Sequence, residues 1–179
     1  MPQTLVEQGG SGAKVAATKR RGDSLALYSP VCWRKRRHLR QHTAILVPVL
    51  ALVVWSLIVW IWMYATRIPA MTAAKLDPQM ARHPGSLDIL PTGPRQVADN
   101  YNHLMEQPTI FYALVFYIFL VNHDTDFAVA LAWTYVALRV IHSLIQNTIN
   151  VVNLRFLVFA TSTLVLMVLA GREVLALVD

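Results

Sequence analysis

The sequence predicts an all-α integral membrane protein, a bundle of four transmembrane helices behind a basic N-terminal tail. Of its 179 residues, 55% are hydrophobic and only 15% are charged. The apolar residues fall in long blocks instead of the short periods typical of a soluble domain. We therefore expect a flexible tail over residues 1–42 and a membrane domain over residues 43–179, with helices at about 43–66, 98–121, 126–147 and 154–178.

Three of these helices are predicted by length. Residues 43–66 contain no charged side chain, and at ~1.5 Å per residue they exceed the ~30 Å hydrocarbon core of a bilayer. Trp60, Trp62 and Tyr64 lie toward the end of this helix, where an aromatic belt would meet the membrane surface. The blocks 127–145 and 154–169 are comparable, although they contain Arg139, His142 and Arg155.

The second helix needs polar residues in order to span. Residues 108–121 are uncharged but give only roughly 21 Å of helix, so residues 102–107 should also cross. Pro108 fits this helix if the helix kinks there or if the freed carbonyl finds another partner.

Most of the net charge of +6 comes from the tail. The run RKRRH at 34–38 indicates contact with anionic lipid and a cytoplasmic N-terminus, with no nucleic-acid partner. Residues 67–98 would then lie outside. A mitochondrial presequence is an alternative for the Arg-rich tail, and Cys32 is either a palmitoylation site or an idle thiol.

Polar residues line up within the predicted spans. Helical spacing places Asp99, Asn102, His103 and Glu106 in one stripe of the second helix. The third helix carries Arg139, His142, Ser143 and Gln146 at the same spacing, and Arg155 begins the fourth. Because isolated charges in a bilayer cost from ~3 to more than 10 kcal/mol, we expect these side chains to converge in one pocket, with Glu106 paired to Arg139.

This constellation is open to several interpretations. Each member could serve helix packing alone, and His103, Glu106 and His142 are of the types that bind metal, although their spacing does not favour a metal site. A pocket with fixed cations, amides and one carboxylate suits a zwitterionic molecule with several carboxylates. Arginine would also favour a thiolate. Glutathione combines these features.

The segments HLMEQPTIFYAL and LRVIHSLIQNTINVVNLRF resemble the MAPEG family, the membrane-associated proteins in eicosanoid and glutathione metabolism, over residues 43–178. The order and spacing are closest to the microsomal prostaglandin E synthase and glutathione transferase branch. The resemblance implies a homotrimer with glutathione between subunits and a lipophilic co-substrate that enters from membrane lipid. It implies that Arg155 stabilises the thiolate catalytically. The implied glutathione-binding residues are Asn102, His103, Glu106, Arg139, His142 and Gln146.

The sequence departs from the family pattern at several of these positions. Asn102 and His103 replace an Arg-Asn pair, and Gln146 replaces a tyrosine. Phe156 and Phe159 replace a serine and a tyrosine of the prostaglandin branch. The family's eukaryotic site also faces the cytosol, whereas the charge distribution turns this pocket outward.

The sequence and the resemblance together predict a membrane-embedded protein that binds glutathione or a similar thiol, in a bacterial inner membrane. A glutathione transferase or peroxidase that acts on a lipophilic substrate is the activity that the resemblance implies. A non-enzymatic scaffold or accessory subunit is the alternative, and a proton or ion pathway has less support, because the polar residues cluster in one half of the membrane.

Overall fold

A computed structural model describes residues 43–83 and 85–178 of the chain. The predictions for the N-terminal tail, including those for the RKRRH run and for Cys32, lie outside these residues.

Four long α-helices make up the described part of the chain, confirming the predicted all-α class. They are α3 (Leu46–Ala73), α4 (Thr92–Leu120), α5 (Asp126–Asn147) and α6 (Val152–Leu175), with a short 3-10 helix η1 (Pro78–Arg82) between the first two. Each of the four is long and apolar enough to cross a membrane. Two helices are longer than predicted, since α3 continues past Pro69 to Ala73, and α4 begins at Thr92 and continues through Pro108.

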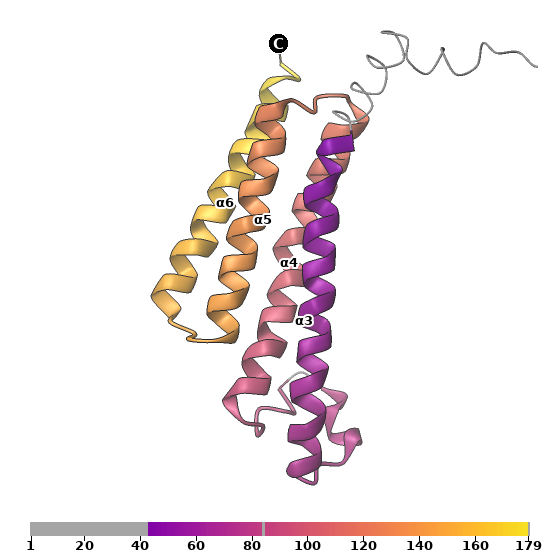
Figure 1. Ribbon diagram of the computed structural model, residues 1–179, viewed down its shortest axis with the longest axis vertical. Coiled ribbons are helices and arrows are strands. Elements are labelled where there is room, and N and C mark those ends of the chain that lie inside the picture. Colours follow the sequence, from indigo (N-terminus) through magenta and orange to yellow (C-terminus); the bar gives the residue numbers. More distant parts are fainter. Residues whose placement is uncertain (1–42, 84, 179) are drawn as a thin grey trace, which may run out of the picture. The chain divides into compact units, whose positions relative to one another are not determined.

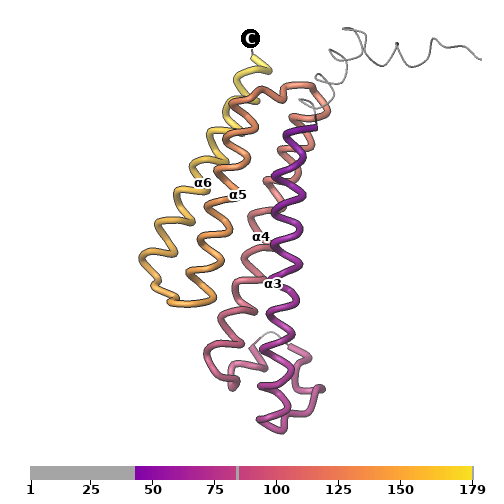
Figure 2. Tube along the Cα trace, in the orientation of Figure 1, coloured from indigo at the N-terminus to yellow at the C-terminus, as the bar shows by residue number. Residues whose placement is uncertain are grey.

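The helices pack as two antiparallel hairpins. Helix α3 packs chiefly against α4, and α5 packs chiefly against α6, while α5 also contacts both helices of the first hairpin. Figures 1 and 2 show that the lower ends of α3 and α4 extend beyond the α5–α6 connection. The 3-10 helix and the loop before α4 lie on this extension, so they are placed outside the length shared by all four helices.

Local sequence explains where the second hairpin begins and turns. The Thr125 hydroxyl accepts a hydrogen bond from the Ala128 amide at 3.3 Å and caps the start of α5. Asn122 and Asn150 adopt positive φ values of 59° and 46° in the connections before and after α5. Asparagine tolerates this left-handed conformation better than most residues, so it suits both tight turns.

The core forms along the inward faces of the helices. Leu52, Phe111, Tyr135 and Leu169, one from each long helix, are fully buried. Large apolar side chains on the opposite faces are exposed, for example Leu50 at 62% and Phe156 at 70%. Helices with apolar side chains around their circumference are typical of a protein surrounded by lipid or by partner helices.

Candidate functional site

Three hydrogen bonds connect the inward face of α4 to the second hairpin. The Asn100 amide donates to the Ser143 hydroxyl at 2.5 Å, and His103 Nδ1 lies 3.0 Å from Gln146 Oε1. Further along α4, Gln107 donates to the Thr163 hydroxyl of α6 at 2.7 Å. The three α4 residues are spaced i, i+3, i+7 and therefore share one face. This face, which we call the polar seam, joins α4 to both α5 and α6.

Two histidines of the candidate site face each other across the α4–α5 contact. The ring centroids of His103 and His142 are 6.1 Å apart. His142 Nδ1 lies 3.0 Å from the Arg155 carbonyl oxygen, and His103 Nδ1 bonds the Gln146 amide oxygen. Since both partners are acceptors, Nδ1 carries the proton in each ring. His142 Nε2 is buried and has no hydrogen-bond partner among the described residues.

Arg139 is almost completely enclosed. It is 1% exposed, and its Nε donates to the Tyr135 hydroxyl at 3.2 Å. Its guanidinium carbon lies 5.3 Å from the Tyr135 ring centroid and 4.7 Å from that of Phe159, which are cation–π distances. Nη2 has no partner. Phe159 therefore covers this arginine with an aromatic ring that has no hydroxyl group.

Arg155 lies at the start of α6, half-buried beside the α5–α6 connection. Its Nη1 donates to the Asn150 side-chain oxygen at 2.6 Å, and its backbone carbonyl accepts from His142. The structure thus brings His103, His142, Gln146 and Arg155 together where α4, α5 and α6 meet. These four residues are the polar cluster.

Glu106 and Asn102 lie elsewhere. Both are exposed on the outward face of α4, as is Asp99, whereas His103 from the same predicted stripe faces inward. The expected ion pair between Glu106 and Arg139 does not form within the described part of the chain, where the ion pairs are Arg95–Asp88, His123–Glu173 and Arg172–Glu173. The predicted single pocket is therefore divided between two faces of α4.

Asn102 lines a separate polar pocket of about 180 Å³, formed by the ends of α3 and α4 and the loop between them. Arg67 of α3 and Asp99 of α4 also line it, along with Arg95, which lies 3.8 Å from Asp88. Among the described residues, no group of three or more His, Cys, Asp or Glu side chains is arranged to hold a metal ion.

Sequence reasoning missed four polar residues, which are Asn100, Gln107 and Thr163 of the seam and its partners and Arg67 of the separate polar pocket. Asn100 and Gln107 were overlooked because the predicted stripe followed the charged residues, which are one position out of phase with the seam. The inward apolar residues of α4, Val97, Leu104, Phe111 and Val115, share the spacing of the seam and would have revealed it. Arg67 falls in the segment 67–98 that the sequence places outside the membrane, whereas the structure includes it in α3.

Comparison with known proteins gives a family but no close relative. The sequence model described as "MAPEG family" matches residues 45–175. The match includes all four long helices and every residue of the polar cluster. No curated protein and no solved structure is significantly similar to the chain.

Proposed function

Because the chain belongs to the MAPEG family, we propose that this integral membrane protein binds glutathione or a similar thiol and uses it on a lipophilic substrate. The reaction would be conjugation to the thiol or reduction of a peroxide. The observation that carries the proposal is the pair of cations in the membrane-spanning part, Arg139 and Arg155, which no described carboxylate neutralises. An unpaired cation in a bilayer is costly, and an anionic ligand would offset that cost.

The two arginines would have different roles. Arg155 is half-buried, so its guanidinium group is the candidate for stabilising a thiolate by opposing its charge. The backbone carbonyl group of Arg155 orients His142. His103 would position the bound molecule through its imidazole group, and Gln146 would do so through its amide group. Arg139, at 1% exposure, would contribute its charge from behind the cluster unless its neighbours move.

The exposed Glu106 supports a homotrimer. Counting ~20 residues back from Leu120 places Glu106 within the hydrocarbon region, where an exposed carboxylate is unfavourable. A second copy packed against the outward face of α4 would cover it together with Asn102. Glu106 would then bind the ammonium group of glutathione at a boundary between subunits, and the site would be incomplete in one chain.

The proposal is tested by glutathione binding to the purified protein in detergent. Calorimetry measures affinity, and ultraviolet absorbance measures thiolate. We expect Arg155→Ala and Glu106→Gln each to weaken binding roughly tenfold or more, since each removes a charge-assisted hydrogen bond. We expect Arg155→Ala also to abolish the thiolate absorbance.

Matched controls remove the same charges elsewhere. Arg82→Ala acts on an exposed residue of η1, and Asp126→Asn acts on an exposed residue at the start of α5. Both should bind like the wild type. Absence of wild-type binding at millimolar glutathione, with the oligomer intact by light scattering, would refute the proposal.

A second candidate function is a non-enzymatic membrane scaffold. It is favoured by the polar seam and by Arg139, whose contacts with Tyr135 and Phe159 serve packing within the chain. A scaffold would keep its oligomeric state in the Arg155→Ala variant and would bind no thiol.

We further propose a bacterial inner membrane with the N-terminus in the cytoplasm. Cys32 is the only cysteine, so its labelling by a membrane-impermeant maleimide reports the side of the tail. Labelling should require permeabilised cells. Labelling of the tail from outside in intact spheroplasts would reverse the proposed orientation.

A further inference from the structure

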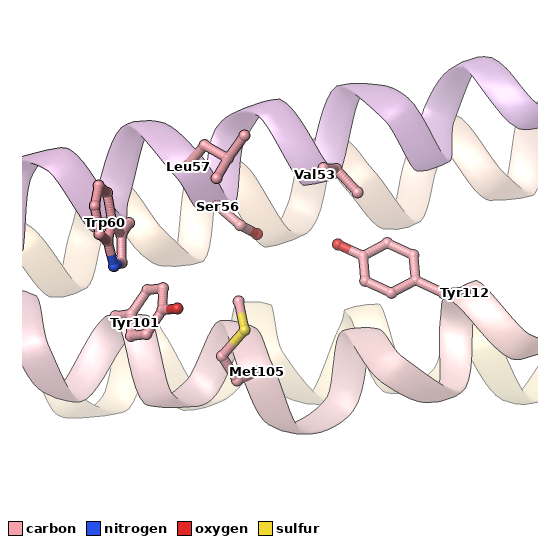
Figure 3. A pocket seen from close by; sticks show the side chains of 7 residues that line it. All are labelled: Val53, Ser56, Leu57, Trp60, Tyr101, Met105 and Tyr112. Atoms are coloured by element: carbon pink, nitrogen blue, oxygen red, sulfur yellow. The ribbon is translucent and has the colours of Figure 1, made fainter.

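A pocket of about 370 Å³ lies between α3 and α4, on a different face from the polar seam. Its lining is mainly apolar and aromatic, with Val53, Ser56, Leu57 and Trp60 from α3 and Tyr101, Met105 and Tyr112 from α4 (Figure 3). Pockets that bind small molecules commonly reach this size and combine an apolar wall with a few polar groups. We call this pocket the α3–α4 groove.

The polar groups of the groove differ between its two ends. At one end, Tyr112 points toward Ser56 across the groove (Figure 3). The Ser56 hydroxyl donates to the Leu52 carbonyl at 2.9 Å, so its oxygen is free to accept from Tyr112. At this end the Ser56 hydroxyl proton is therefore already used within the protein, and the Ser56 oxygen faces the Tyr112 hydroxyl.

At the other end, two donors have no partner among the described residues. Figure 3 shows the indole nitrogen of Trp60 pointing toward Tyr101, whose hydroxyl group lies along the groove. The Trp60 ring is held by an edge-to-face contact with Tyr64, with centroids 4.9 Å apart. The donors thus lie on opposite walls, and one of them belongs to a ring that is fixed in place.

The two ends of the groove lie at different depths in the membrane. Counting ~20 residues back from Leu120 places Tyr101 at the edge of the hydrocarbon region, whereas Tyr112 lies well inside it. Donors left unpaired at this edge favour a ligand with an acceptor, because a polar group in lipid is costly without a hydrogen bond. The deeper part of the groove suits hydrocarbon.

We propose that the α3–α4 groove binds the lipophilic substrate, with a carbonyl or hydroperoxide oxygen at Trp60 and Tyr101 and its hydrocarbon chain toward Val53 and Leu57. As the substrate site it rests on the function proposed above, whereas binding itself can be measured without glutathione. Tyr101 and Met105 directly precede Asn102 and Glu106 on neighbouring faces of α4. The acceptor oxygen would therefore lie next to the face on which the thiol site is proposed.

The test is photolabelling of the full chain in lipid nanodiscs by a fatty ketone that carries a diazirine, without glutathione. Mass spectrometry maps the labelled residues. Competition by 2-undecanone measures affinity, and undecane serves as the ligand that lacks an acceptor. We expect labels within residues 53–60 and 101–112, and stronger competition by the ketone than by the alkane.

Variants separate the donors from the apolar wall. Tyr101→Phe and Trp60→Phe should each weaken competition by the ketone about three- to tenfold, the effect of losing one hydrogen bond, and leave that of undecane unchanged. Leu57→Trp replaces an exposed leucine by a larger side chain that fills the groove. It should therefore reduce photolabelling of the groove itself. The matched controls are Tyr117→Phe and Trp133→Phe, which alter the same residue types outside the groove.

Three outcomes would overturn the proposal. Labels confined to other surfaces would place the ligand elsewhere, and equal competition by ketone and alkane would show only unspecific lipid contact. An unlabelled groove, with crosslinks between copies through Met105→Cys, would show that a second copy covers it. The glutathione-binding measurement tests the proposed function, and photolabelling tests the groove. The two are independent, since a chain that fails to bind thiol can still be labelled in the groove.

Discussion

Replacing Tyr135 by phenylalanine tests whether Arg139 is held as the structure shows. Tyr135 is fully buried, and its ring stacks on Phe111 with centroids 4.5 Å apart. The substitution keeps that stack and the cation–π contact but removes the oxygen that accepts from Arg139 Nε. Since Nη2 already has no partner, the buried guanidinium group would then have two unpaired nitrogens.

The cost follows from the charge on the donor. A hydrogen bond to a charged group contributes about 1.5–3 kcal/mol to the free energy of unfolding. For a protein of this size, each kcal/mol lowers Tm by about 2–4 °C, so Tyr135→Phe should lower it by about 3–12 °C. Tyr135→Leu should be less stable still, because it also removes the aromatic stack, which contributes about 0.5–1.5 kcal/mol.

The measurement is thermal unfolding in one detergent, followed by circular dichroism. Tyr117→Phe is the control, because the hydroxyl group of this half-buried tyrosine on α4 forms no side-chain hydrogen bond with the described residues. A Tyr135→Phe protein that melts with the wild type would show that the tyrosine hydroxyl does not hold Arg139, and the proposed enclosed role of this arginine would fail.

Two further predictions concern the ends and the middle of the bundle. Ser143→Ala should lower the free energy of unfolding by about 0.6–1.7 kcal/mol, the range for hydrogen bonds between membrane helices, because it leaves the buried Asn100 amide unpaired; an unchanged Tm would contradict this. Glu173→Gln should speed hydrogen exchange in residues 121–126, because the 3% exposed carboxylate anchors His123 at 2.9 Å and Arg172 at 3.1 Å. The same exchange rate in both proteins would show that this contact does not anchor the α4–α5 connection.

The fold was predictable because length and hydrophobicity determine membrane helices almost alone. The structure has α5 at Asp126–Asn147, the range predicted from the apolar block, and the Thr125 side chain caps its start. The start of α4 was missed by several residues, because the polar segment after Pro91 extends beyond the apolar span. Charge and spacing identified His103, His142 and Gln146 as neighbours. They could not show that Glu106 faces outward, because the rotation of a helix depends on which neighbour its apolar residues contact.

The polar seam has a consequence for assembly of the bundle. The first hairpin buries mainly apolar side chains, such as Leu52, Leu104 and Phe111, and such surfaces slide past a neighbour at little cost. The seam sets their register, because moving one hairpin along the other by a single turn of ~5.4 Å would separate every one of its hydrogen-bonded pairs at once. Those pairs are Asn100–Ser143, His103–Gln146 and Gln107–Thr163. The same hydrogen bonds that set the register of the hairpins also set where Arg155 and His142 meet along the bundle. A loosened seam would therefore misalign the candidate site before it unfolded the protein.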